Sequence, residues 1–589
     1  MIKYIQVGSE LIKQQDLFEK HNLISSVVFQ FKTYVFITKR FVINLLHPIQ
    51  KFSNDQKDLN LPIIASSESD LWNISDNEKN WLLTAGKVEN LRVAVKRLNG
   101  IEVPANQTFS FWKQVGSPSF FKGYVKGREI REGCVIPTIA GGLCQLSNAL
   151  YDTALKANFQ IVERHKHTKV IQGSLAEHDR DATVKWNYVD LRFKSKFNFR
   201  IEAELTATKL IINFKSLQDK FESVDKNFIP KKPDDLNDCY SCGNFDCFTH
   251  PGKNELKQTS KLQVFILDEK WAEFDDYINS IAREQDYFIL PLKKNWLIKS
   301  TRYSWRAMKM RVKTVSLFGI YRAIKLRLQA KKNNIFELSL QLDKTIAQAM
   351  VKKIPIESTH VLISQNLLPF IYQTGALGGR TFDVLMTRLP MQMMHDRLNF
   401  AHSMHPQSPT LNDYRASEQL IDLENQALTR ARKIITPHTE LTNIFKNKVE
   451  KLIWKTTVQI SNKKQVSANK ILFPASALGR KGAYEIKKLA QEFNFIPVVS
   501  GRALEHENFW GELKPEQFKG SYDDIFLVVY PTYIESQPRK ILKAIAKGIP
   551  VITTLACGIE ASDRVKIIEL GNYSQLKKEV YEQLKTVNG

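Results

Sequence analysis

The second half of the chain alternates short apolar runs with longer amphipathic ones, and this alternation strongly limits the possible folds. The short runs have the length and the β-branched content of buried strands. They are KLQVFIL, THVLIS, TFDVLMT, KIITP, NKILFPAS, FIPVVSG, DIFLVVYP and IPVITT. Strands separated by helices form parallel sheets that are covered on both faces. We therefore expect two Rossmann-like α/β lobes in this part of the chain.

The whole chain has 589 residues, which is too many for a single hydrophobic core. Before the α/β part, helical and alternating segments are mixed, which indicates an α+β domain. A polar, charged stretch separates the two parts and has the composition of a linker. The predicted parts are an N-terminal helical and loop region, the α+β domain, the linker and the two lobes, at 1–79, 80–216, 217–260, 261–440 and 441–589.

The net charge of +24 favours a polyanionic partner, such as a phosphate-bearing substrate or an acidic lipid. Lysines spread over a solvated surface would explain the same charge. We see no signal-peptide pattern, and the apolar stretch 23–46 is interrupted by Lys32, Lys39 and Arg40. The sequence predicts a cytoplasmic protein, peripheral at the inner membrane if it binds lipid.

The main chemical signal of the α+β domain is a cysteine that follows two glycines. Cys144 opens the helical run QLSNALYDTALKAN. A helix N-terminus lowers the pKa of a thiol and offers N–H groups to an oxyanion. Histidines and an aspartate follow in an order that suits a nucleophile, its base and the group that orients the base. The candidate catalytic residues are Cys144, His165, His167 and Asp181. The alternative is a buried structural thiol beside closely packed glycines.

Three segments of this domain occur in the order of a known family. They are EVPANQTFSFWKQVG, AGGLCQLSNALYDTALKANFQIVERHKHT, and RDATV with YVDLRF. Together they resemble the VanW family over about residues 80–216. The resemblance implies a bacterial protein linked to the cell envelope, but it supplies no mechanism.

Half of the chain's six cysteines lie close together in the linker, in the pattern C-x2-C-x4-C-x2-H. Three thiolates and one imidazole suit tetrahedral zinc, and four protein ligands leave no open position, so the site would be structural. An iron–sulfur cluster is the second possibility, and free cysteines in a linker are the third. The predicted ligands, called here the Cys3His cluster, are Cys239, Cys242, Cys247 and His250.

Two segments of the last lobe, ILFPASALGRKG at 471–482 and YPTYIESQPRKILKAIAKGIPVITT at 530–554, resemble family-4 retaining glycosyltransferases. That family has the GT-B fold and binds a nucleotide-sugar donor between its lobes. The resemblance implies these donor-binding residues: Arg480, Lys481, Gly482 and Glu535. Two positions depart from the family pattern, with Ser476 in place of an arginine and Lys543 in place of a second acid. Either the donor differs, or the lobe does not catalyse, or it is an α/β domain without a donor.

From Tyr287 to Phe336 the chain has no acidic residue, and its many lysines and arginines alternate with large apolar side chains. Such a basic amphipathic segment suits the surface of an anionic membrane, and a solvated helical face is the alternative. Nucleic acid is not expected as a partner, because no known binding module accompanies the segment.

Taken together, these features predict a glycosyltransferase of envelope glycan or glycolipid synthesis. It would move a sugar from a nucleotide donor to a lipid-linked or glycan acceptor. The alternative is a thiol hydrolase or acyltransferase that acts on an envelope peptide or amide through Cys144, with a C-terminal unit that only binds glycan. A non-catalytic scaffold is the third hypothesis.

Overall fold

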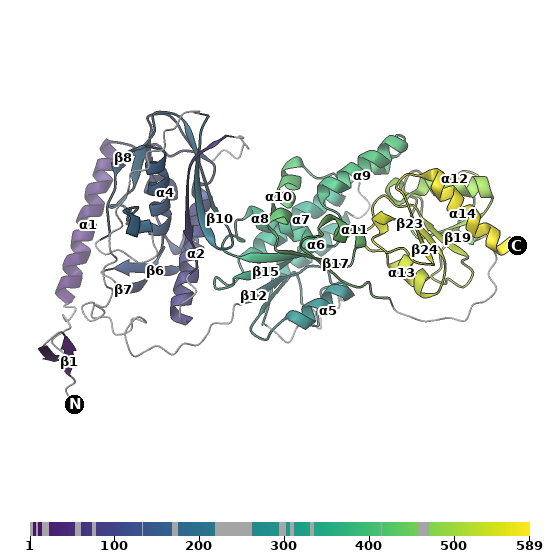
Figure 1. The fold of residues 1–589 in the computed structure, drawn as a ribbon, viewed down its shortest axis with the longest axis horizontal. Helices are drawn as coiled ribbons and strands as arrows, with labels where there is room; N and C mark the ends of the chain where they lie inside the picture. Colours follow the sequence, from purple (N-terminus) through teal and green to yellow (C-terminus); the bar gives the residue numbers. More distant parts are fainter. Residues whose placement is uncertain are drawn as a thin grey trace. The chain divides into compact units, whose positions relative to one another are not determined.

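The computed structural model describes most of the chain. The described residues are 4–7, 10–13, 23–53, 61–72, 78–131, 134–167, 175–217, 262–293, 302–306, 311–329, 335–413, 415–456 and 470–588. They divide into two compact units, one built mainly from residues before 263 and one mainly from residues after it. Figure 1 labels helices and strands of both units.

The first unit is built on a four-stranded antiparallel sheet with the order β3-β11-β10-β4. Its strands are β3 (Ile63–Asp70), β4 (Ile101–Val103), β10 (Phe199–Leu205) and β11 (Lys209–Lys215). In β10 and β11 buried and less buried residues alternate, as the sequence pattern predicts for strands with one face on a core. Since β3 precedes residue 80, the sheet begins earlier in the chain than the predicted domain.

Among the residues described in this unit, smaller sheets and four α-helices complete the fold. The sheets are β5-β9-β8 and the hairpin β6-β7, with strands at Thr108–Ser110, Arg192–Lys194, Gln160–Glu163, Lys126–Arg131 and Cys134–Ile139. The helices are α1 (Leu23–Leu46), α2 (Glu78–Leu98), α3 (Phe111–Val115) and α4 (Cys144–Lys156). Helices α2 and α4 pack on the four-stranded sheet over a core that includes Phe159, Phe193 and Phe214. The short strands β1 (Tyr4–Val7) and β2 (Glu10–Lys13) pair separately.

The second unit contains two parallel sheets, as predicted. The first lobe has seven strands in the order β14-β13-β12-β15-β16-β17-β18. Their bounds are β12 (Gln263–Ile266), β13 (Tyr287–Leu290), β14 (Arg311–Thr314), β15 (His360–Ser364), β16 (Thr381–Leu385), β17 (Lys433–Thr436) and β18 (Val449–Lys451). Its helices are α5 (Ala272–Ile281), α6 (Ser316–Leu328), α7 (Ile335–Val351), α8 (Leu368–Gln373), α9 (Met391–Met404), α10 (Glu418–Arg430) and α11 (Thr439–Ile444). Because β18 belongs to this sheet, the lobe continues past residue 440.

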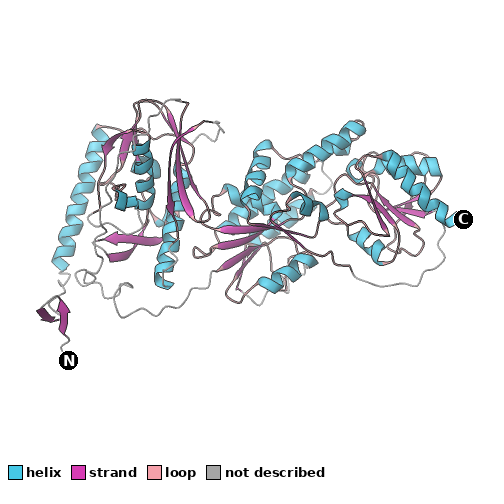
Figure 2. Cartoon of the chain, viewed as in Figure 1, coloured by secondary structure: helices cyan, strands magenta, loops and turns pink. Residues whose placement is uncertain are grey.

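The second lobe has six strands in the order β21-β20-β19-β22-β23-β24. Their bounds are β19 (Lys470–Phe473), β20 (Ile496–Val499), β21 (Glu516–Gln517), β22 (Leu527–Tyr530), β23 (Val551–Thr554) and β24 (Val565–Ile568). The helices are α12 (Ala483–Phe493), α13 (Arg539–Ala546) and α14 (Tyr573–Asn588). In both lobes helices flank the sheet (Figure 2).

The strand orders contain one point in each lobe that matters for binding. In the first lobe the order reverses between β12 and β15, and in the second between β19 and β22. Loops diverge to opposite faces of the sheet at such a switch point, so a crevice opens beyond the carboxyl ends of the two strands. Residues that follow these four strands are therefore expected to line a binding site.

Within the part of the chain that the structure describes, no helix combines the length and the apolar composition that a membrane span requires.

Candidate functional site

Helix α4 places the Cys144 thiol at its first turn. The chain enters the helix through Gly142, whose φ of 96° lies in the left-handed region. A Cβ at this position would collide with the Lys87 side chain, so the turn requires glycine. Cys144 is a half-buried residue, and its Sγ lies 3.6 Å from Thr183 Oγ1 and 3.9 Å from Val184 O.

His167 lies between this thiol and Asp181. Its Nδ1 is 2.5 Å from Asp181 Oδ1, and its backbone N–H donates to Asp181 Oδ2 at 2.6 Å. The imidazole is also close enough to the Cys144 thiol to lower the pKa of that thiol. Asp181 is 3% exposed, so its charge is poorly screened. The structure thus brings together three of the four residues predicted for a thiol centre.

The protonation of these groups is coupled. Burial lowers the pKa of His167, but hydrogen bonds to Asp181 and Cys144 outweigh it and raise that pKa to about 10. Burial raises the pKa of Cys144, while the hydrogen bond and charge of His167 oppose it, and the net change is a lowered pKa. The lowered pKa of Cys144 and the raised pKa of His167 both favour a thiolate beside an imidazolium. Such a pair is the resting form of many activated thiol nucleophiles.

His165 does not join this group, and in this respect the predicted set needs correction. Its ring is largely exposed, and Nε2 lies 3.3 Å from Glu163 Oε1. Glu163 therefore holds His165, whereas Asp181 holds His167. Two histidines two residues apart cannot be distinguished by spacing alone, because the choice depends on which carboxylate each one reaches.

The structure also gives structural partners to two polar residues of α4. The Gln145 side-chain amide donates to Ser69 Oγ and Asp70 O, at 2.9 and 2.8 Å. Asn148 Oδ1 accepts the Ala182 N–H at 2.7 Å, next to Asp181. Asn148 therefore fixes the segment that carries Asp181 and Thr183. Sequence reasoning missed Thr183, since a hydroxyl in an irregular segment gives no pattern.

In the second lobe, two of the predicted donor-binding residues follow the strands of the switch point. Lys481 comes after β19 and Glu535 after β22, and Lys481 Nζ donates to Glu535 Oε2 at 2.9 Å. Lys481 Nζ also donates to Ile534 O at 2.7 Å. Side chains from two adjacent strand ends thus meet at the place where an α/β sheet binds ligands.

The Glu535 carboxylate has several further donors. Its Oε1 accepts the N–H groups of Ser536 and Gln537, both at 2.8 Å, and Oε2 accepts the Tyr530 hydroxyl. Burial raises the pKa of Glu535, but Lys481 and these donors outweigh it and lower the pKa to about 2. The side chain therefore carries its negative charge at every physiological pH.

The remaining residues of the predicted donor site have different environments. Gly482 has φ 83°, and a Cβ there would collide with Pro531 O, so only glycine allows α12 to start so close to that loop. Burial raises the pKa of Asp413, and the charge of Arg480 opposes part of this rise, so the two groups are neighbours. Ser476 Oγ donates to Ser500 O at 3.4 Å. Lys543 is exposed on α13 and does not take the place of a buried acid.

The switch point of the first lobe holds a buried charge cluster that sequence reasoning missed. Asp268 follows β12 and pairs with Arg322 of α6, which also donates to Asp343 Oδ1 at 2.7 Å. Asn366, after β15, donates to Asp268 Oδ2 at 2.6 Å. Arg322 was predicted as one cation of the basic segment, but it is 4% exposed and neutralises these acids.

Helix α6 carries the described apolar part of the basic segment. Its exposed side chains form a stripe at helical spacing: Leu317, Phe318, Tyr321, Ile324 and Leu328. Leu317 and Leu328 are 83% and 74% exposed. Lys325 and Arg327 lie in the last turn of the helix. Helix α6 therefore has an exposed apolar stripe with two cations in its last turn.

The predicted metal ligands cannot be placed, because the Cys3His cluster lies outside the described residues. Among the residues that the structure does describe, no group of three or more His, Cys, Asp or Glu side chains has a metal-binding arrangement.

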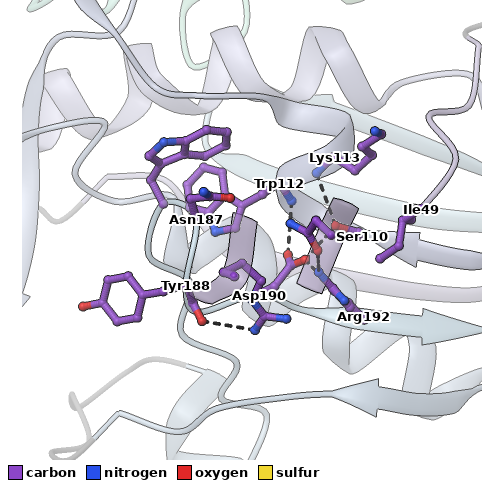
Figure 3. A pocket seen from close by; sticks show the side chains of 11 residues that line it. Ile49, Ser110, Trp112, Lys113, Asn187, Tyr188, Asp190 and Arg192 are labelled. Atoms are coloured by element: carbon purple, nitrogen blue, oxygen red, sulfur yellow. Dashed lines mark hydrogen bonds and ion pairs between the residues drawn. The ribbon is translucent and has the colours of Figure 1, made fainter. Parts of the chain in front are cut away.

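A pocket of about 120 Å³ lies in the first unit, and none of the predicted site residues lines it (Figure 3). Trp112, Asn187 and Arg192 are among its lining residues. Asp190 organises one wall, because it accepts hydrogen bonds from Ser110 Oγ at 2.6 Å and from Arg192 Nε at 2.9 Å. The polar groups here largely satisfy one another, so the pocket offers few open donors or acceptors to a ligand.

Comparison with known proteins agrees with the prediction for the first unit. Residues 86–215 match the family described as VanW like protein. The uncharacterized protein YoaR of Bacillus subtilis is 35% identical over 109 residues, which are 18% of this chain and 35% of that protein. The vancomycin B-type resistance protein VanW of Enterococcus faecalis is 31% identical over 112 residues, 18% of this chain and 41% of that protein. The chain thus matches less than half the length of either relative.

The second unit is similar in fold to solved glycosyltransferases. The match to the crystal structure of TarM covers 56% of this chain and 93% of the TarM chain, with 10% identity and a TM-score of 0.36. Sucrose-phosphate synthase from Thermosynechococcus elongatus covers 56% and 95%, with 11% identity and a TM-score of 0.35. Anabaena HepE, solved in complex with UDP, covers 55% and 90%, with 11% identity and a TM-score of 0.30.

At these identities and TM-scores the likeness does not bear on activity, and the two-lobed fold rests on the strand orders themselves. The VanW resemblance predicted from the sequence is confirmed for residues 86–215. Residues 86–215 form a VanW-like domain, and the chain continues into a unit that contains two parallel α/β sheets.

Proposed function

We propose that the second unit transfers a sugar from a nucleotide donor to an envelope glycan or a lipid-linked acceptor. The observation that carries this proposal is the pair formed by Lys481 and Glu535 at the β19–β22 switch point. A cation next to the start of α12 suits a diphosphate, because the helix N-terminus adds backbone N–H groups and a partial positive charge. A carboxylate that stays ionised can accept hydrogen bonds from sugar hydroxyls.

In this proposal Lys481 has two alternative anionic partners. Without a donor it is bound by Glu535 and Ile534 O. A diphosphate would compete for the ammonium group, and Glu535 would keep its three other donors and accept from the sugar instead. Arg480 and Gly482 belong to the same turn and complete the proposed donor loop.

The acceptor is proposed from the surface of α6. An apolar stripe flanked by Lys325 and Arg327 suits the interface of an anionic membrane, where apolar side chains enter the headgroup region and cations contact lipid phosphates. A lobe held at such a surface would reach a lipid-linked acceptor. We therefore propose a peripheral location at a membrane. Separately, we propose that the Cys3His cluster of the linker binds zinc.

Isothermal titration calorimetry tests the donor site. Uridine diphosphate sugars are the first probes, and we expect binding to the full chain that weakens by ~1–3 kcal/mol in Lys481→Ala, as loss of a charged hydrogen bond implies. Lys578→Ala, an exposed lysine of α14, is the matched control and should bind like the wild type. If no nucleotide sugar binds, and none is hydrolysed or transferred, the proposal fails.

Vesicle flotation tests the membrane surface separately. We expect binding to vesicles with an anionic lipid and little binding to neutral ones, with a loss of about 1 kcal/mol for each of Lys325→Gln and Arg327→Gln. Lys578→Gln should leave binding unchanged. Equal binding to neutral and anionic vesicles would contradict the membrane proposal without affecting the donor site.

A further inference from the structure

The VanW-like domain contains a second arrangement that the glycosyltransferase proposal does not use. Cys144 is at the first turn of α4 and is half-buried, and His167 is close enough to its thiol to lower the pKa of that thiol. Asp181 binds His167 through both oxygens, one to Nδ1 and one to the backbone N–H. The Nδ1 contact leaves Nε2 as the ring nitrogen for the thiol.

This arrangement exceeds what packing requires. A structural thiol needs only apolar neighbours, and Cys144 does contact the apolar core of the domain. Its sulfur nevertheless lies 3.6 Å from the Thr183 hydroxyl and interacts with the His167 imidazole, which is held by the buried carboxylate of Asp181. Arg164 donates to Asp181 O and Asn148 accepts from Ala182, so the segment that holds the carboxylate is itself fixed from two sides.

We propose that Cys144 is the nucleophile of a separate active centre that accepts an acyl group from an amide or ester. His167 carries the proton, and Asp181 is a positioning residue that orients the imidazole. The start of α4 supplies the electropositive environment that stabilises the negative charge developing on the carbonyl oxygen. The proposal does not depend on sugar transfer by the second unit.

The reaction has two balanced halves. In the first, the Cys144 sulfur bonds to the carbonyl carbon, the bond from that carbon to the leaving nitrogen or oxygen breaks, and the leaving group takes a proton from His167. In the second, water or an amine attacks the thioester and gives its proton to His167, and the sulfur leaves as thiolate. Water as the second reactant gives hydrolysis, and an amine gives acyl transfer.

An activated ester tests the first half directly. With 4-nitrophenyl acetate we expect a burst of about one nitrophenolate per full-length chain, and peptide mass analysis should find the acetyl group on Cys144. Cys144→Ser should abolish the burst, since a serine hydroxyl is not ionised in this setting. Circular dichroism of each variant separates loss of chemistry from loss of fold.

Two histidine variants form a matched pair. His167→Gln should slow acylation at least 100-fold, whereas His165→Gln, two residues away and bound to Glu163, should acylate like the wild type. Equal effects of the two substitutions would show that the structure has assigned the wrong histidine and would overturn the proposal. Acetyl groups found on surface lysines in place of Cys144 would overturn it as well.

The pH profile of the acyl-transfer rate tests the role of Asp181. Asp181→Asn removes the charge that favours the imidazolium, so the alkaline limb of the profile should move to lower pH. The groups that face this site are Thr183 and the Arg164 guanidinium, which is bound to Asp179 and to the Asp181 backbone, and neither is changed by the substitution. A uniform loss of rate at every pH would mean a purely structural role for Asp181. It would remove this part of the proposal.

Discussion

Replacing Glu535 by glutamine tests whether the Lys481 pair stabilises the second lobe as the structure indicates. The substitution keeps the size of the side chain and removes its charge. In the wild type the charge is stabilised by Lys481 Nζ at 2.9 Å, by the Tyr530 hydroxyl and by two backbone N–H groups. Together they lower the pKa of Glu535 from an ordinary value of 4.5 to about 2.

A pKa difference of this size corresponds to about 3 kcal/mol of unfolding free energy, at roughly 1.4 kcal/mol per pKa unit. The folded pKa is the lower one, so this stabilisation is fully present above pH 4.5 and is lost as the pH falls towards 2. Glutamine would lack it at every pH. We therefore expect Glu535→Gln to destabilise the lobe by about 3 kcal/mol at pH 7, with Lys481 left without its counter-ion.

Hydrogen exchange measured by mass spectrometry reports this lobe without requiring the whole chain to unfold in one step. Amides of β19 and β22 should exchange roughly 100-fold faster in Glu535→Gln than in the wild type, the factor that about 3 kcal/mol implies. Glu512→Gln, an exposed acid of the same lobe, is the control and should leave exchange unchanged. A change below about threefold in Glu535→Gln would refute the reasoning.

Three further predictions concern other parts of the chain. Gly482→Ala should lower the melting temperature of the second lobe and abolish donor binding, because a Cβ at φ 83° collides with Pro531 O; a melting temperature equal to that of the wild type would contradict this. Alkylation of Cys144 by iodoacetamide should have its pH midpoint below the ordinary thiol value of 9, since His167 lowers that pKa, whereas Cys557, buried and with a raised pKa, should stay unreactive in the folded protein. Elemental analysis of anaerobically purified protein should find one zinc per chain bound by the Cys3His cluster; protein without metal, or with iron, would rule zinc out.

Much of the fold could be predicted from the sequence because its signals are local. Every apolar run quoted for the two lobes contains a strand of a parallel sheet. The strands β13, β14, β18, β21 and β24 were missed. Of these, β14, β18 and β21 have no long apolar run, because charged or polar residues interrupt them. The first-unit strand β3 was also missed, because its burial comes from pairing with β11 about 140 residues later.

The candidate sites likewise have some features that the local sequence shows and others that it does not. The glycines before Cys144 and after Lys481 mark two tight turns that only glycine allows, and the sequence shows both. The partner of each charged side chain was not predictable. Arg322 looked like one more surface cation, but it is buried between Asp268 and Asp343, which lie 54 residues before it and 21 after it.

The sequence by itself therefore determined the two parallel lobes, the VanW-like domain and the turns that carry Cys144 and Lys481. Periodicity, glycine placement and motif spacing are properties of short segments, so they can be recognised from the sequence alone. Only the tertiary structure decided that His167 and not His165 meets the thiol, and that Glu535 holds Lys481. These choices depend on which carboxylate lies within about 3 Å, because a charge interaction in a buried site is set by distance and not by position along the chain.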